Sequence, residues 1–263
     1  MNCHNGEKYL RQSILSIINQ TYKNWELIFW DNKSSDDSRK ILKSFRDKRI
    51  KYYKSLRLLN LYDARNYAIN KSKGKFLAFL DTDDWWKKNK LEKQVKKILT
   101  DKNIKLIFTN SFIYDQIAKK KKIYIKKNLT SSNITQNLLD DYSISLLTVL
   151  VSKDEFKKNK FNSKLNIIGD FDYFTKLSLR SEIEYIDETL AYYRVHNNNF
   201  SKQKLNLYIL ELKNWIKNNG HLFEEKNYSL TKLKLYLKKL QFKYIIQITK
   251  INIDKFIGRV VQW

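Results

Sequence analysis

Segments with two different apolar periodicities alternate along the first half of the chain. Short runs that are too compact in apolar residues for a helix indicate buried strands, and they cover residues 25–30, 50–53, 75–80 and 104–108. Between them, apolar residues recur at helical spacing over residues 6–20, 38–45, 63–73 and 91–99. Such alternation, with short polar turns, predicts an α/β fold: a doubly wound, mostly parallel sheet flanked by helices.

The pattern becomes less regular after residue 110. Residues 111–127 indicate a basic hairpin, and the four lysines at 119–122 are typical of a solvated tip. Strand-like, helical and again strand-like segments follow at residues 146–152, 169–180 and 183–195.

The C-terminal part contains only amphipathic basic helices, over residues 205–223 and 230–248. We therefore predict an α/β domain over residues 1–201 and a basic helical extension over residues 202–263. These C-terminal helices could pack on the domain, form a dimer contact or lie on a membrane surface.

The composition predicts a folded chain with a basic surface. Of the 263 residues, 42% are hydrophobic, which supplies a core large enough to offset chain entropy and excludes disorder throughout. The 52 Lys and Arg against 27 Asp and Glu leave a formal charge of +25. Lysine is spread everywhere while Gly and Pro are scarce, a pattern typical of A+T-rich coding, so no nucleic-acid partner is expected. Anionic membranes, nucleotides or lipid-linked phosphates would still be attracted.

Cysteine usage and hydropathy bear on location. Cys3 is the single cysteine, so no intrachain disulfide can form and a reducing compartment is expected. No window approaches the roughly 18 consecutive apolar residues of a membrane span, and the first residues lack a signal-peptide pattern. We expect a cytoplasmic protein, soluble or peripheral at the inner face of the cell membrane.

Carboxylates gather where two predicted strands end. Asp31 and Asn32 follow one strand, and Asp81, Asp83 and Asp84 follow another. In an open parallel sheet, ligands bind at the carboxyl ends of the strands. Three carboxylates within four residues repel one another unless a cation lies among them, and these oxygen donors suit Mg²⁺ or Mn²⁺ carrying phosphate oxygens. The alternative is a solvated acidic turn that caps the next helix.

Motifs that occur in order along the chain carry a resemblance to a known family. They are N-G-E-K-Y-L at residues 5–10, N-Q-T-Y at 19–22, W-E-L-I at 25–28, A-R-N at 64–66 and G-K-F-L-A-F-L-D-T-D-D at 74–84. Together they resemble a family 2 glycosyltransferase with the GT-A fold, densely over residues 5–100 and again over 167–201. The resemblance implies inverting transfer of a sugar from a nucleotide-sugar donor, with Mg²⁺ or Mn²⁺ as cofactor.

The resemblance also implies donor-site roles by position. It places Asp31 and Asn32 at the nucleoside, Arg65 at the base or phosphate, and Asp81 with Asp83 near the ribose and the metal. Most members have Asp where this chain has Asn32, which leaves the base preference open. Arg65 could instead be a cation on the helix surface.

Two further residues complete the metal set that the resemblance implies. Asp84 would join or replace Asp83 as a ligand. His196, in the closing Y-R-V-H segment, would ligate the metal or donate to a phosphate, with a structural role as the alternative. Trp85 and Trp86 could wall the sugar or acceptor site, or simply pack.

The catalytic base is expected in a second acidic element. I-I-G-D-F-D at residues 167–172 occupies the position of the family's acidic catalytic motif, whose first residue is often Glu and is Gly169 here. Inverting transfer needs a base opposite the leaving nucleotide, because the acceptor hydroxyl loses its proton as it attacks. Asp170 is the candidate for this base. An N-cap role for Asp170, or Asp172 as the base, are the alternatives.

Family members usually begin with an apolar strand, of which residues 1–4 replace only the tail. We therefore expect the first strand to be missing, through a fragment, a wrong start or a damaged domain, with two exposed edges in the sheet. The expected function is transfer of a sugar from a UDP-linked donor to a glycan or lipid-linked acceptor in cell-surface polysaccharide synthesis. The alternative is a truncated, catalytically impaired relative that acts as a binding or scaffold protein.

Overall fold

The structure is a computed structural model that describes residues 1–126, 129 and 134–260, and gives only the backbone for residues 201, 202 and 250–260. The chain divides into two compact units. The first comprises Met1–Leu138 and Tyr142–His196, and the second comprises Leu139–Asp141 and Asn197–Trp263. The proposed domain limit between residues 201 and 202 stays a prediction.

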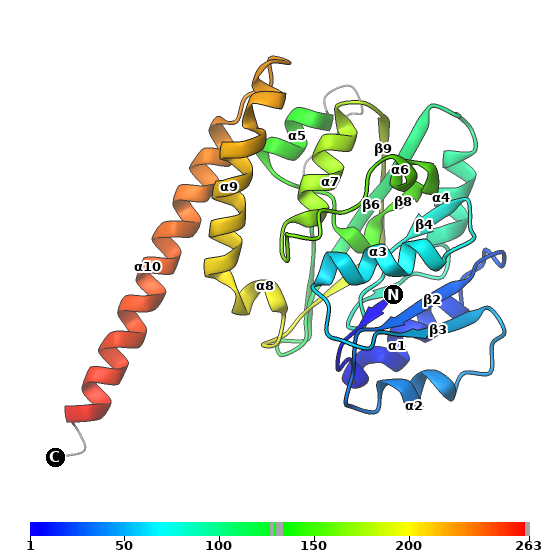
Figure 1. The fold of residues 1–263 in the computed structure, drawn as a ribbon, viewed down its shortest axis with the longest axis horizontal. Coiled ribbons are helices and arrows are strands. Elements are labelled where there is room, and N and C mark those ends of the chain that lie inside the picture. Colours follow the sequence, from blue (N-terminus) through cyan, green and yellow to red (C-terminus); the bar gives the residue numbers. More distant parts are fainter. Residues whose placement is uncertain (127–128, 130–133, 261–263) are drawn as a thin grey trace. The chain divides into compact units, whose positions relative to one another are not determined.

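The N-terminal part of the first unit forms a parallel sheet (Figure 1). In spatial order its strands are β1 (Asn2–Cys3), β2 (Leu27–Asp31) and β3 (Ile50–Lys54). The helices between and after these strands are α1 (Glu7–Ile18), α2 (Ser38–Lys43) and α3 (Leu61–Lys71). All residues of β2 are buried, as expected for a strand with a continuous apolar run.

A second sheet of mixed direction completes the first unit. Its spatial order is β4 (Phe76–Ala78), β8 (Leu150–Ser152), β6 (Ile104–Asp115), β9 (Glu182–Val195) and β5 (Trp85–Trp86), and β7 (Lys120–Ile123) pairs with β6. Only the β6–β9 pair is parallel. The predicted α/β class with flanking helices is confirmed, whereas the parallel arrangement is confined to the first sheet and this pair. Apolar periodicity identifies a strand but carries no information on its direction.

Helices cover the second sheet and make up the second unit. In the first unit they are α4 (Lys90–Ile98), α5 (Ile134–Asp140, whose last residues belong to the second unit), α6 (Lys153–Lys158), α7 (Gly169–Ser178) and a 3₁₀ turn at Leu146–Thr148. In the second unit they are α8 (Phe200–Gln203), α9 (Leu205–Glu224) and α10 (Thr231–Val260).

The strand β6 is longer than the predicted run at 104–108. Thr109, Asn110 and Ser111 are polar but buried, and they continue the pairing with β9. Their polarity hides the strand from a search for apolar runs. The predicted basic hairpin is formed by β6 and β7, and the strand-like residues 183–195 lie in the single strand β9.

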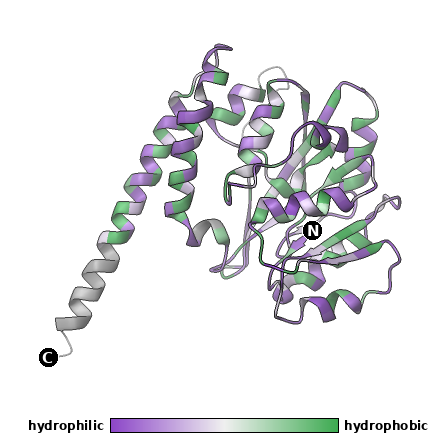
Figure 2. Cartoon of the chain, in the orientation of Figure 1, coloured by the Kyte–Doolittle hydropathy of each residue, from purple (hydrophilic) through white to green (hydrophobic). Residues whose placement is uncertain are grey.

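Hydrophobic residues are frequent in the strands of the first unit (Figure 2), and their side chains pack into more than one core. One core contains Phe108 and Phe174, and another contains Leu10, Phe29 and Trp86. Trp86 therefore packs, and its indole N–H donates to the carbonyl of Leu147 at 2.8 Å.

A cavity of about 690 Å³ lies inside the first unit, and its walls include residues of β2 and β4. Leu27 and Ile28 line one side and Leu77 lines another, while Arg65 and Asp81 also face it. Among the described residues, β4 pairs with β8 alone and β1 extends along only the last part of β2. The cavity thus lies where both strands have an edge without a partner strand.

Candidate active site

An ion pair connects α3 with the acidic turn after β4. The amide of Asn60 caps α3 by accepting the Asp63 N–H at 2.9 Å, which fixes the start of the helix. Arg65, one turn further on, is only 5% exposed and donates to both carboxylate oxygens of Asp81, at 2.9 and 3.0 Å. Burial, the largest single effect, would lower the pKa of Arg65, but the charge and hydrogen bonds of Asp81 together with the charges of Tyr62 and Asp170 outweigh it and raise the pKa. The alternative of a helix-surface cation is therefore wrong.

Asp31 and Asn32 lie together at the end of β2. The Asp31 carboxylate accepts the Ser34 N–H at 2.7 Å and the Tyr52 hydroxyl at 2.7 Å. Burial and this carboxylate raise the pKa of Tyr52 to about 12. The Asn32 amide donates to the Leu59 carbonyl at 2.8 Å and accepts the Leu59 N–H at 3.0 Å. Asn32 thus holds the loop before α3 through both ends of its amide.

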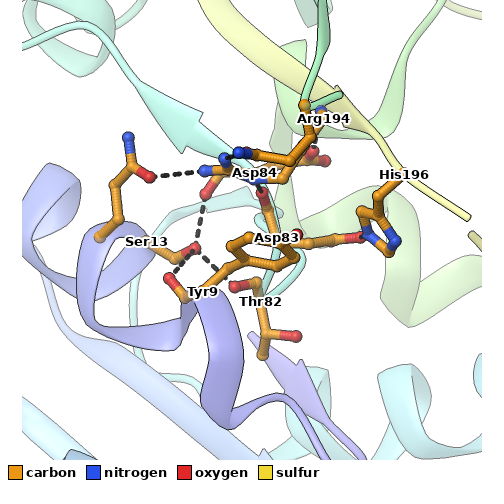
Figure 3. Close-up of polar contacts among 9 residues, drawn as sticks. Tyr9, Ser13, Thr82, Asp83, Asp84, Arg194 and His196 are labelled. Atoms are coloured by element: carbon orange, nitrogen blue, oxygen red, sulfur yellow. Dashed lines mark hydrogen bonds and ion pairs between the residues drawn. The ribbon is translucent and has the colours of Figure 1, made fainter. Parts of the chain in front are cut away.

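The acidic turn at residues 81–84 is fixed from two sides (Figure 3). The Ser13 hydroxyl lies 2.7 Å from the carbonyl oxygen of Thr82 and 2.6 Å from that of Asp84, and it donates to them. The Asp84 side chain is 2% exposed and accepts the Arg194 backbone N–H at 2.8 Å. Burial, followed by the charges of Asp83 and Asp81, raises the pKa of Asp84 well above its ordinary value. The Asp84 carboxylate is therefore engaged with β9.

Asp83 and His196, two of the residues expected to bind a metal, contact each other in the structure. Asp83 Oδ2 lies 2.9 Å from His196 Nε2 (Figure 3). Burial and the Asp81 charge raise the pKa of Asp83, against the opposing effect of His196. Within the described part of the chain, no three His, Cys, Asp or Glu side chains assemble into a metal site. Of the expected metal set, Asp83 and His196 therefore lie together, whereas Asp84 is engaged with β9, and a metal role for these residues stays a prediction.

Arg194 organises this region, although the sequence analysis gave it no role. Its side chain is 4% exposed, and Nε donates to the Asp83 carbonyl at 2.7 Å while a terminal nitrogen donates to Gln12 at 2.5 Å. The guanidinium also lies over the rings of Tyr9 and Trp85, at 4.3 and 4.5 Å. Its presence in the Y-R-V-H segment beside His196 was the only sequence signal.

Asp170 lies in the first turn of α7 and is held by two tyrosines. The Tyr62 hydroxyl donates to Asp170 Oδ1 at 2.7 Å, and the Tyr142 hydroxyl contacts Oδ2 at 3.4 Å. Burial raises the pKa of Asp170, opposed by the Tyr62 hydrogen bond and by Arg65. Asp172, the alternative base, is 5% exposed and forms an ion pair with Lys176 at 2.5 Å.

Gly169 has a steric reason to be glycine. A Cβ atom at this position would lie 2.5 Å from Cδ2 of Tyr62, closer than side chains approach in proteins. The glutamate that the family often has here cannot fit beside this tyrosine without movement.

The helix α3 joins the two acidic elements. Arg65 carries the ion pair with Asp81, and the charges of both Asp81 and Asp170 raise its pKa. Its guanidinium lies 5.1 Å from the ring of Tyr62, which holds Asp170. Arg65 therefore contacts the acidic turn directly and lies against Tyr62, the residue whose hydroxyl donates to Asp170 at the start of α7.

Comparison with known proteins identifies the family. The model for "Glycosyl transferase family 2" matches residues 1–150. A glycosyltransferase of Methanocaldococcus jannaschii is 31% identical over 82% of this chain and 77% of its own length. The Escherichia coli UDP-Glc:alpha-D-GlcNAc-diphosphoundecaprenol beta-1,3-glucosyltransferase WfgD is 35% identical over 68% and 67%. The putative teichuronic acid biosynthesis glycosyltransferase TuaG of Bacillus subtilis is 31% identical over 76% and 79%.

The fold agrees with this result. The Staphylococcus aureus TarS 1–349 structure in complex with UDP-GlcNAc matches with a TM-score of 0.66 at 18% identity, over 82% of this chain. The match spans 65% of the TarS chain. The likeness confirms a GT-A-like fold, and together with the family model and the curated relatives it leads to one assignment: this chain is a member of glycosyl transferase family 2.

Proposed function

We propose that this protein transfers a sugar with inversion from a UDP-linked donor to a glycan or lipid-linked acceptor in cell-surface polysaccharide synthesis. The observation that carries the proposal is that Arg65 pairs with Asp81 of the proposed donor turn and lies against Tyr62, which holds the candidate base Asp170. WfgD is named for a UDP-Glc donor and a lipid-linked acceptor, and TuaG for teichuronic acid biosynthesis, which supports this donor and acceptor class.

The donor diphosphate would lie against the acidic turn. Asp83 and His196 would hold a Mg²⁺ or Mn²⁺ ion, which when bound neutralises the diphosphate and stabilises the leaving nucleotide. Asp31 and Asn32, at the end of β2, are the proposed nucleoside contacts. In this proposal Asn32 acts through the Leu59 loop that it holds, because both ends of its amide already have partners.

Asp170 would act as the general base. The acceptor hydroxyl oxygen forms a bond to the anomeric carbon while the bond from that carbon to the diphosphate oxygen breaks, and Asp170 takes the hydroxyl proton. Burial raises the pKa of Asp170, which increases its basicity in the ionised form, and Tyr62 holds it in place.

The helix α10 is the proposed membrane contact. Leu233 and Leu240 are buried on one face, while Leu235, Phe242 and Ile246 are exposed on the opposite one. The lysines at 238, 239 and 243 flank this exposed stripe, as in helices that lie on anionic bilayers. Among the described residues, no helix is both long and apolar enough to cross a membrane.

A donor panel with Mg²⁺ or Mn²⁺, read out by nucleotide release and by calorimetry, tests the proposal. Asp83→Ala should weaken metal-dependent UDP binding at least about tenfold, because it removes one of two protein donors to the ion. UDP binding that is equal in chelator, in the wild type and in Asp83→Ala, would contradict the metal role. Tight UDP binding without any transfer would favour the scaffold alternative.

A further inference from the structure

One face of the second sheet carries a row of aromatic side chains. Trp85 of β5 pairs in register with Tyr192 of β9, and Tyr192 pairs with Phe112 of β6. Tyr114 lies two residues further along β6 and therefore points to the same side. The neighbouring residue Trp86 points to the other side, where it is buried in a core. We refer to Trp85, Phe112, Tyr114 and Tyr192 as the aromatic face.

The rings of the aromatic face contact one another in a continuous row. Trp85 stacks on Tyr192 with centroids 4.6 Å apart and planes within 6°, and it meets Tyr114 edge-on at 5.4 Å. Phe112 lies 5.0 Å from Tyr192. All four side chains keep part of their surface exposed, unlike the aromatic residues of the cores. A preformed, partly exposed row of rings is suited to bind the apolar face of a flat ligand.

Two lysines give the aromatic face a positive charge. The ammonium groups of Lys121, on β7, and Lys87, after β5, lie 4.7 and 5.3 Å from the ring centroid of Phe112. In the part of the chain that the structure describes, neither ammonium has a carboxylate within ion-pair distance. Their charges are therefore available to an anionic ligand.

The aromatic face begins at the acidic turn of the donor site. Trp85 follows Asp84 directly in the chain. Arg194 lies over the Trp85 ring and donates to the Asp83 carbonyl, so one side chain joins both regions. A ligand on the aromatic face would thus lie beside the proposed position of the donor diphosphate.

From this position we propose that the aromatic face, with Lys87 and Lys121, binds the acceptor as a sugar ring that carries a phosphate or diphosphate. The sugar ring packs against the exposed edges of the aromatic row, because Tyr192 and Arg194 already cover the faces of Trp85, and the phosphate lies between the two ammonium groups. This inference rests on the proposed transferase function, because it gives the ligand the role of acceptor. The free phosphate and an anionic lipid surface share the charge but not the sugar ring, so the test separates them.

Adjacent lysines of β7 provide a matched pair of variants. Lys121 pairs with Tyr114 and lies on the aromatic face, whereas Lys122 pairs with Ile113 and lies on the opposite side of the same strand. Both are exposed, so Lys121→Glu and Lys122→Glu make the same charge change with little cost in stability. We expect the first to weaken binding of glucose 1-phosphate about tenfold, and the second less than about twofold.

The measurement is an NMR or calorimetric titration with glucose 1-phosphate, glucose, inorganic phosphate and phosphatidylglycerol vesicles. Preference for glucose 1-phosphate together with the Lys121-specific loss supports the proposal. It is overturned if both variants lose binding equally, if inorganic phosphate binds as well as the sugar phosphate, or if only vesicles bind. UDP affinity, measured in parallel, should be the same in both variants. Failure of the wild type to bind UDP would instead contradict the donor site, since the titration of the aromatic face does not depend on it.

Discussion

The acidic turn at residues 81–84 and the start of α7 resemble each other: each combines carboxylates that are bound to the surrounding fold with one that has a proposed function. The turn presents three carboxylates and the start of α7 presents two, and in each element all but one are held by groups of the fold; in the turn, Asp81 pairs with Arg65. Asp84 accepts the Arg194 backbone N–H, and Asp172 pairs with Lys176. The other carboxylate of each element, Asp83 or Asp170, has a histidine or a tyrosine hydroxyl as its partner, which are groups that a substrate or metal can replace or share. We therefore expect the type of partner, more than the position in the motif, to distinguish the structural carboxylates (Asp84 and Asp172) from the carboxylates with a proposed role in binding or catalysis (Asp83 and Asp170).

The largest effect is expected from removal of the proposed base. Asp170→Asn keeps the shape and the acceptor for Tyr62 but cannot take a proton, so turnover should fall by about 10²–10⁴ while UDP affinity is unchanged. Steady-state kinetics and UDP calorimetry measure the two quantities. The control is Asp172→Asn, the same chemical change one half-turn away, which should leave turnover within a few-fold. Normal turnover in Asp170→Asn would remove the distinction between the two acids.

A smaller effect, on the free energy of unfolding alone, is expected from replacement of Asp84, the structural carboxylate of the turn. Asp84→Ala leaves the Arg194 N–H buried without an acceptor, which costs about 1–3 kcal/mol of unfolding free energy. Asp84→Asn retains an acceptor oxygen and should restore most of this loss. Chemical denaturation measures both. If Asp84→Asn instead abolished metal-dependent UDP binding while stability stayed intact, Asp84 would have a role in metal binding and not only a structural one.

The smallest effect concerns a buried lysine, Lys90, for which the described part of the chain provides no ion pair. Lys90 is fully buried, donates to the Gln94 amide at 2.7 Å and lies over the Trp86 ring, and burial lowers its pKa well below the ordinary value. At pH values between the lowered pKa of the folded chain and the unfolded pKa of about 10.4, the unfolded chain therefore binds an additional proton, and the fold loses stability as the pH falls through this range.

Lys90→Met tests this sign. Between pH 10 and pH 7, the wild type should lose stability relative to the variant, by about 1 kcal/mol or more. The variant also loses the bond to Gln94, but that cost does not change with pH. Thermal denaturation over this range gives the difference. A constant difference would mean that Lys90 keeps its proton inside the fold, through the amide and ring contacts alone.

Local patterns predicted much of the first half of the fold. Apolar periodicity placed α1, β2, α2, β3, α3 and α4 within a few residues of their observed bounds, because in these segments burial and spacing agree. It did not predict the two-residue strand β5 or the short helix α6, which tertiary pairing and packing stabilise.

The candidate site divides in a similar way. The clustering of carboxylates selected Asp83, and the family resemblance selected Arg65 and Asp170, but the contacts of these residues join distant parts of the chain. The bond from Arg194 to Asp84 spans 110 residues, and the one from His196 to Asp83 spans 113. No local pattern carries that information. The buried position of Arg65 could not be predicted from the sequence, because an arginine in a helix is usually exposed at the surface.

The close approach of Gly169 to Tyr62 has an evolutionary consequence. A glutamate at position 169 would require a smaller side chain at position 62, and that replacement would remove the hydroxyl that holds Asp170. The two positions are therefore epistatic. Neither single replacement is expected to be neutral, because Gly169→Glu beside Tyr62 gives a steric overlap and a smaller residue at position 62 removes one of the two tyrosine hydroxyls that contact Asp170.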